Sequence, residues 1–184
     1  MNRSAVPTRS HGPEPRGLAS PGHFCEELPV RVIGIGNPMR ADDALGWEAL
    51  LRLERDCLPG VDYVRFGGDC SQLAELLLVS RAAVVIDAVH GAGEPGTLVF
   101  WDLADPRPEL VPHGEARISG HGYGICETLG LCRLLGRLPR PLVLVGVEGL
   151  TFGFGTEMSA PVAAALPSVV GAVRQELRRI AGRP

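Results

Sequence analysis

Apolar residues along this chain follow two different spacings, and the two spacings alternate. Apolar runs, typical of strands buried on both faces of a parallel sheet, lie at 30–35, 82–86 and 142–147, and the last two are continuous. Shorter strand-like runs lie at 63–66 and 97–103. Apolar residues at helical spacing occupy the segments between and after them, at about 43–57, 71–77, 119–135 and 162–180. The sequence therefore predicts an α/β fold: a single domain of three layers, with a twisted, mostly parallel sheet of about five strands and helices on both faces.

Several single residues carry finer predictions within these helices. Ser71 is expected to cap the second helix at its N-terminus, because serine is a preferred capping residue. Cys57, Cys126 and Cys132 lie among apolar helix positions and are expected to be small core residues. Leu135 is expected on the buried face of the third helix. The last helix is expected to bury seven apolar residues, namely Val162, Leu166, Val169, Val170, Val173, Leu177 and Ile180.

The first residues differ in composition from the rest of the chain. Residues 1–28 are rich in Pro, Gly, Ser and Arg and show no apolar period, so they are predicted to form a flexible leader. The prolines in this stretch disfavour the amphipathic helix that a transit peptide needs. The folded domain is therefore expected at 29–184.

Composition and charge exclude several classes of function. The net charge is −3 at pH 7, so nucleic acid and anionic membranes are poor candidate partners. The longest uncharged stretch, 158–173, contains two prolines and predicts no transmembrane helix. The five cysteines form no Cys-x-x-Cys pair, and the first residues lack the apolar segment of a secretory signal. These features predict a reduced, cytoplasmic protein.

The glycine turn after the first strand, Gly34-Ile35-Gly36-Asn37-Pro38, invites comparison with dinucleotide-binding turns. The third glycine of that motif is missing, because position 39 is Met. Pro38 also removes one of the amides that a pyrophosphate would need. A nucleotide-binding module therefore stays the weaker alternative.

Three side chains at predicted strand and helix ends are candidate site residues. Asp43 follows the glycine turn and has two explanations, a helix N-cap or a functional carboxylate, although Asp42 beside it exceeds what capping requires. Asp87 ends a buried strand, where a carboxylate must be hydrogen-bonded, paired or metal-bound. His121 lies between two glycines, which allow a ligand to approach closely. Two carboxylates and an imidazole suit a divalent metal such as zinc or nickel.

Four stretches together resemble the hydrogenase maturation endopeptidases, in an order that covers residues 30 to 180: GIGNPMRADDALG, VVIDAVHGAGEPGT, SGHGYGICETL and LVLVGVEG. The resemblance implies an endopeptidase that removes the C-terminal extension of a nickel–iron hydrogenase large-subunit precursor. It also implies that Asp43, Asp87 and His121 are the catalytic and metal-contacting residues. The nickel would be carried by the precursor, so no resident cofactor is expected.

The resemblance leaves some features open. Some relatives carry Glu where this chain has Asp43, and the family often has an acidic residue before the pair Gly67-Gly68, whereas Asp69 follows the pair here. Asp42 and Asn37 are expected to orient neighbouring groups. Cleavage could be metal-assisted or carboxylate-driven, as in an aspartic-type endopeptidase. A non-catalytic chaperone that binds nickel or the precursor is the alternative function, and the sequence does not indicate an oligomeric state.

Overall fold

The computed structural model describes residues 28–104, 122–155 and 157–182. The predicted leader lies outside these residues except for Leu28, so the boundary at residue 28 stays a prediction. Among the described helices, none combines the length and the apolar composition needed to cross a lipid bilayer.

Five strands form one sheet, in the order β2-β1-β3-β5-β4. Their bounds are β1 (Val30–Ile35), β2 (Val61–Phe66), β3 (Ala82–Val89), β4 (Leu98–Asp102) and β5 (Leu142–Glu148). Neighbouring strands pair in parallel except β4, which runs antiparallel to β5 at one edge. The strand that contains Trp101, β4, is therefore an edge strand of the described sheet.

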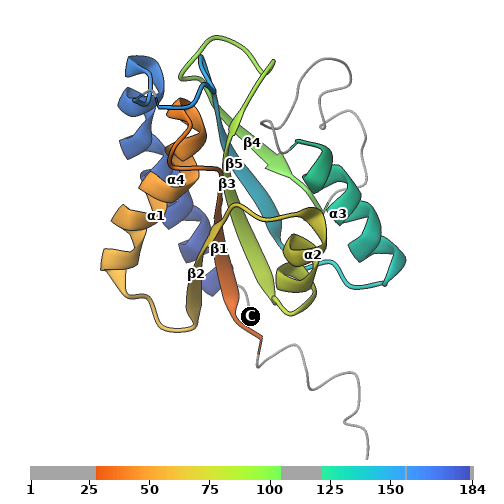
Figure 1. Cartoon of the computed structure of the whole chain (residues 1–184). Helices are drawn as coiled ribbons and strands as arrows, with labels where there is room; N and C mark the ends of the chain where they lie inside the picture. The colour runs from red at the N-terminus through yellow and green to blue at the C-terminus, as the bar shows by residue number, and fades with distance from the viewer. Residues whose placement is uncertain (1–27, 105–121, 156, 183–184) are drawn as a thin grey trace, which may run out of the picture.

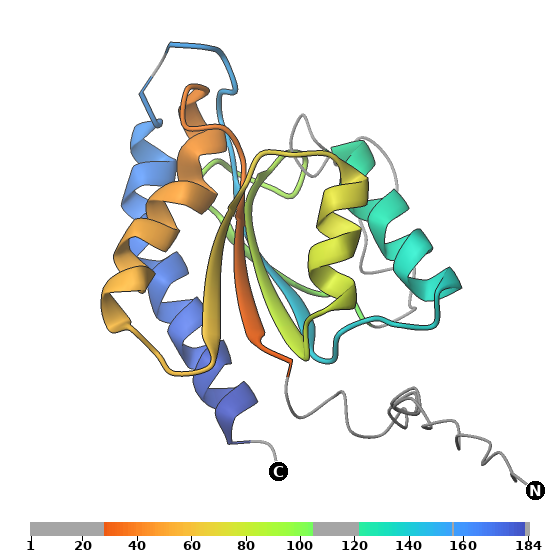
Figure 2. The same ribbon diagram turned by 60° about the horizontal axis from the view of Figure 1, so that its bottom comes forward.

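Four helices cover the two faces of the sheet, so the predicted three-layer α/β fold is confirmed (Figures 1 and 2). The helices α1 (Leu45–Leu53) and α4 (Ala160–Ala181) lie on one face, and α2 (Cys70–Leu78) and α3 (Gly122–Leu134) lie on the other. Two short 3-10 helices, η1 (Ala41–Ala44) and η2 (Glu54–Asp56), flank α1.

The apolar runs of the central strands supply both halves of the core. Every residue of β3 and β5 is buried. Along β3 the side chains alternate, so that Val84 and Ile86 join the core under α1 and α4, whereas Ala83 and Val85 join the core under α2 and α3. The seven apolar residues predicted for the last helix are all buried in α4. Burial on both faces explains why these strands show no alternation in the sequence.

Some local predictions were wrong. Asp69, and not Ser71, caps α2: its carboxylate accepts the backbone N–H groups of Ser71 and Gln72. Together with the Ser71 hydroxyl, the largest cause, these bonds lower the pKa of Asp69. Cys57 is exposed, in the left-handed region at the end of η2, whereas Cys132 is buried as expected. Leu135 follows the end of α3 and is exposed. The side chain of Cys126 lies outside the described residues.

An ion pair joins the end of the α1 segment to α4 and predicts a pH dependence of stability. The carboxylate of Asp56 accepts two hydrogen bonds from the Arg174 guanidinium, at 2.7 and 2.8 Å, and these bonds hold the pKa of Asp56 below its ordinary value of 3.8. The stabilisation is therefore complete above pH 3.8 and is lost as the pH falls through the lower, folded-state pKa.

We expect Asp56→Asn to remove this dependence. The free energy of unfolding of the wild type should fall more steeply below pH 3.8 than that of the variant, as measured by urea unfolding between neutral and acidic pH. Asp62→Asn is the matched control, because Asp62 makes only a looser contact with Arg31, at 3.6 Å, and its side chain is 53% exposed. Parallel pH curves for the wild type and Asp56→Asn would contradict the prediction.

Candidate functional site

The first turn of α1 lies directly on the carboxyl ends of β1 and β3, because two glycines remove the side chains between them. A β-carbon on Gly46 would lie 2.3 Å from the carbonyl oxygen of Ile35 and 2.8 Å from that of Ile86. A β-carbon on Gly34 would lie 2.3 Å from the carbonyl oxygen of Gly46. No larger residue fits this approach without moving the backbone. The two glycines therefore bring η1, which carries Asp42 and Asp43, to the carboxyl ends of β1 and β3.

The glycine turn predicted from the sequence wraps around Asp43. Gly36 has a φ of +134°, and a β-carbon there would lie 1.8 Å from the Asp43 carbonyl oxygen and 3.5 Å from its Oδ1. The Asn37 backbone N–H donates to the same carbonyl, and Asn37 Oδ1 accepts the Met39 N–H. The turn packs against the chain's own backbone at the place where a dinucleotide-binding turn would approach a pyrophosphate.

Capping does not explain Asp43. The side chain is 1% exposed, and the residue lies inside η1 and not at the start of a helix. The residue before η1 is Arg40 and the residue before α1 is Ala44, and neither makes a capping hydrogen bond with its side chain. The capping explanation that the sequence allowed is therefore wrong, and the functional role of this carboxylate stays a prediction.

Asp87 lies within β3 and does not end it, because β3 continues to Val89. Its side chain is fully buried, and the alternation of the strand places it on the face that α2 and α3 cover. Gly34 pairs with Ile86, so Asp87 is level with the last residue of β1. Since η1 also contacts β3, Asp43 and Asp87 lie at the same end of the strands, on two elements that touch although α1, η2, β2 and α2 separate them in the chain.

His121, the third predicted site residue, lies outside the described residues. The helix that follows it, α3, starts at the end of the molecule toward which β1 and β3 run (Figure 1). In the part of the chain that the structure describes, no group of three His, Cys, Asp or Glu residues could hold a metal ion. The convergence of Asp43, Asp87 and His121 on one ion stays a prediction.

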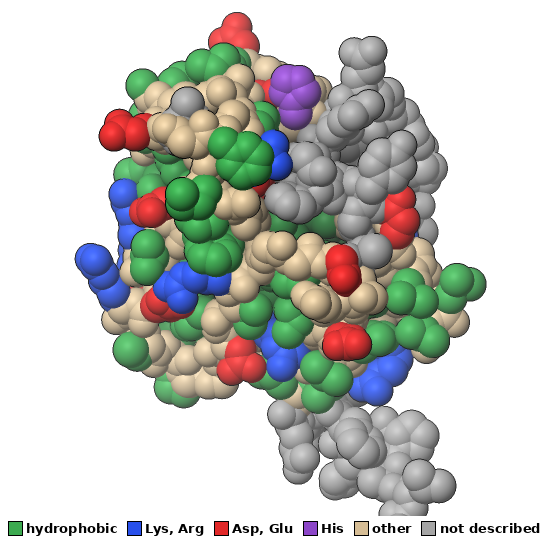
Figure 3. Space-filling model, in the orientation of Figure 1, with side chains coloured by type: hydrophobic (Ala, Val, Ile, Leu, Met, Phe, Trp, Pro, Cys, Tyr) green, Lys and Arg blue, Asp and Glu red, His purple; other side chains and the backbone are tan. Residues whose placement is uncertain are grey.

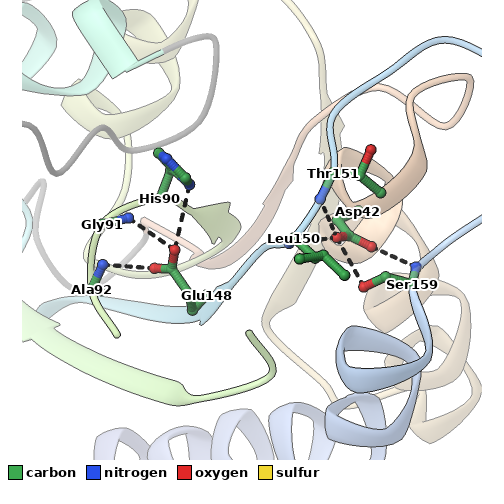
Figure 4. Close-up of polar contacts among 8 residues, drawn as sticks. All are labelled: Asp42, His90, Gly91, Ala92, Glu148, Leu150, Thr151 and Ser159. Carbon is green, nitrogen blue, oxygen red and sulfur yellow. Dashed lines mark hydrogen bonds and ion pairs between the residues drawn. The ribbon is translucent and has the colours of Figure 1, made fainter. Parts of the chain in front are cut away.

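Asp42 has a structural role, distinct from that of its neighbour. Its buried carboxylate accepts the backbone N–H groups of Leu150, at 2.8 Å, Thr151, at 2.9 Å, and Ser159, at 2.6 Å, and the Ser159 hydroxyl, at 3.0 Å (Figure 4). The Asp42 N–H donates to the Thr151 carbonyl. These bonds hold the segment between β5 and α4 against η1, and the expected role of Asp42 in orienting groups of the site stays a prediction.

Glu148 is a fourth buried carboxylate near the carboxyl ends of the strands, after Asp42, Asp43 and Asp87, and sequence reasoning missed it. It is 3% exposed and accepts the backbone N–H groups of Gly91, at 2.9 Å, and Ala92, at 2.6 Å, while His90 Nδ1 lies 3.4 Å away (Figure 4). These contacts fix the turn that follows the strand of Asp87. The signal was present, because Glu148 closes the apolar run at 142–147 much as Asp87 closes the run at 82–86.

The chain is similar to proteins that mature hydrogenases. The family model HycI, described as hydrogenase maturation protease, matches residues 57–176, a range that contains Asp87 and His121 and begins after Asp43. Hydrogenase 2 maturation protease from Escherichia coli (strain K12) is 33% identical in an alignment of 156 residues that covers 79% of this chain and 91% of that protein. Hydrogenase expression/formation protein HupM from Azotobacter chroococcum mcd 1 is 33% identical over 142 residues, 74% of this chain and 66% of HupM.

The solved structures agree on the fold. The hydrogenase maturating endopeptidase HybD from E. coli superposes with a TM-score of 0.70 at 23% identity, over 84% of this chain and 94% of that one. A likeness at this level of identity shows the same arrangement of strands and helices.

Proposed function

We propose, because the chain belongs to the hydrogenase maturation proteases, that it removes the C-terminal extension of a nickel–iron hydrogenase large-subunit precursor after nickel has been inserted. The observation that carries the proposal is the pair of carboxylates, Asp43 and Asp87, buried at one edge of the sheet. Membership of a protease family supports peptide-bond hydrolysis, and carboxylates are groups that can perform it. The site lies where α/β folds of this kind bind their ligands.

In the proposed reaction, one of the two carboxylates accepts a proton from a water molecule as that water attacks the scissile carbonyl. The bond between the carbonyl carbon and the amide nitrogen then breaks, and the nitrogen leaves as an amine after taking up a proton. In the metal-assisted form, the nickel of the substrate polarises the carbonyl or the water. In the carboxylate-driven form, Asp43 and Asp87 perform the proton transfers alone.

Nickel is proposed to act as a recognition element on the substrate. Soft thiolate ligands of the precursor would hold the ion more firmly than two carboxylates and an imidazole do. Asp43, Asp87 and His121 would therefore contact the nickel without removing it. Such a weak contact makes cleavage depend on a metal that the enzyme does not keep.

We expect the protein to shorten nickel-loaded precursor and to leave nickel-free precursor intact, because only the loaded form offers the ion to the site. The mass of the large subunit, followed over time for both forms, measures this difference. Equal shortening of both forms would contradict the nickel dependence and leave the protease activity standing. Binding of the loaded precursor without any change in mass would favour the chaperone alternative.

A further inference from the structure

An exposed apolar surface lies beside the two carboxylates and has no role in the function proposed so far. It consists of Met39, Arg40, Leu150, Phe152 and Phe154, and we call it the rim surface. Met39 is 66% exposed, Leu150 58% and Phe154 73%, and these large apolar side chains belong to two segments that lie against each other. Figure 3 shows hydrophobic side chains gathered near a histidine on the upper part of this face.

The rim surface is preformed, because its two segments are bonded to each other. The Gly155 N–H donates to the Met39 carbonyl at 3.0 Å, and Arg40 Nε donates to the Phe152 carbonyl at 3.1 Å. The hydrogen bonds of Asp42 to residues 150 and 151 fix the same two segments. A surface that needs little ordering on binding loses little affinity to conformational entropy.

The rim surface also presents one positive charge. The guanidinium carbon of Arg40 lies 4.8 Å from the centre of the Phe154 ring, a cation–π contact. None of the ion pairs among the described residues includes Arg40. The surface therefore combines apolar side chains with a guanidinium that is held in place and can donate hydrogen bonds to a carboxylate of a partner.

The rim surface is continuous with the proposed site. The Asp43 N–H donates to the Arg40 carbonyl at 2.9 Å, so the surface and the buried carboxylate belong to one tight turn. On the other side, the Phe152 ring meets the His90 ring edge-on, with 6.2 Å between the centres, and His90 leads back to β3. The surface therefore adjoins the turn that carries Asp43.

We infer that the rim surface docks a segment of the precursor polypeptide that carries an apolar side chain and a nearby carboxylate. This inference rests on the proposed function and names the part of the enzyme that would recognise the substrate away from the scissile bond. The apolar side chain would pack against Met39, Leu150 and Phe154. The carboxylate would pair with Arg40, and the paired segment would hold the cleavage point at the buried carboxylates.

The experiment compares Arg40→Glu and Phe154→Ala with the wild type in steady-state trimming of nickel-loaded precursor. Each variant should raise KM by about 10-fold or more, the effect of losing one important interface contact, and should change kcat by less than about 2-fold. Phe154→Ala keeps the Arg40 hydrogen bond, so it tests the surface even if Arg40→Glu disturbs the turn. In addition, exchanging acidic residues of the precursor for Arg should yield one variant that restores trimming by Arg40→Glu.

Matched controls separate docking from general effects of the substitutions. Leu134→Ala removes an 87% exposed leucine at the end of α3. Arg55→Glu reverses an exposed charge in η2. Both variants should leave KM unchanged. An unchanged KM for Arg40→Glu and Phe154→Ala overturns the inference while trimming by the wild type still supports the proposed function. A change in self-association of these variants, measured by sedimentation, without a change in KM also overturns it, because the surface would then bind a second copy of the chain.

Discussion

Asp87→Asn is expected to fold like the wild type and to trim the precursor at least about 100-fold more slowly, the usual cost of losing a group that transfers protons. The amide has nearly the shape of the carboxylate, so the fully buried position can hold it. It cannot accept a proton at neutral pH, and as a neutral group it contacts a cation more weakly. The mass of the large subunit over time measures trimming, and thermal unfolding measures the fold.

The control for this prediction is the same substitution at an exposed aspartate of the same sheet. Asp62 lies on the edge strand β2 with a side chain that is 53% exposed, and Asp62→Asn should trim at the wild-type rate. If Asp87→Asn keeps the wild-type rate, the assignment of the site is wrong. If it unfolds, a structural role of the carboxylate accounts for its burial.

The fold was predictable because its strongest signals do not depend on distant residues. Strands β3 and β5 are buried along their whole length and β1 at every position except Arg31, which fits the apolar runs seen at these three places in the sequence. The long helix α4 meets the sheet with one face only, which requires apolar residues at helical spacing.

Element ends were less predictable, because side-chain chemistry does not decide them alone. A buried aspartate in an apolar run suggested the end of a strand, but the backbone of β3 continues to pair with β5 through Asp87 to Val89. Asp69 and Ser71 are both good capping residues, and only the position of the first helical turn decides that Asp69 accepts the free N–H groups.

The candidate site was predictable in part. The rule that ligands bind at the carboxyl ends of parallel strands selected Asp43 and Asp87, and both are buried at that edge. The same rule applied to Glu148. Its role in fixing a turn depends on hydrogen bonds from Gly91 and Ala92, which precede it by 57 and 56 positions in the chain. Asp42 and Asp43 look alike in sequence. Their roles differ only through tertiary contacts, because Asp42 accepts hydrogen bonds from residues more than 100 positions further along the chain.

That separation gives the second large expected effect. Asp42→Ala should lower the free energy of unfolding by about 3 kcal/mol, because three backbone N–H groups and one hydroxyl lose their acceptor and each unmet bond costs about 1 kcal/mol or more. Water can reach some of these partly buried groups. The loss of stability therefore stays below the summed cost of four hydrogen bonds left without any partner. Urea unfolding at neutral pH measures the change.

Asp43→Asn is the matched variant, one residue along the same short helix, and the opposite result is expected for it. Its free energy of unfolding should lie within about 1 kcal/mol of the wild-type value, because the amide has nearly the shape of the carboxylate. Its rate of trimming should fall as that of Asp87→Asn does. At saturating precursor, the folded molecules of Asp42→Ala should keep the kcat of the wild type, since the Asp42 carboxylate is occupied by residues 150–159. The two aspartates would have the reverse roles if Asp42→Ala kept its stability and lost trimming while Asp43→Asn unfolded, and the site would then have to be rebuilt around Asp42.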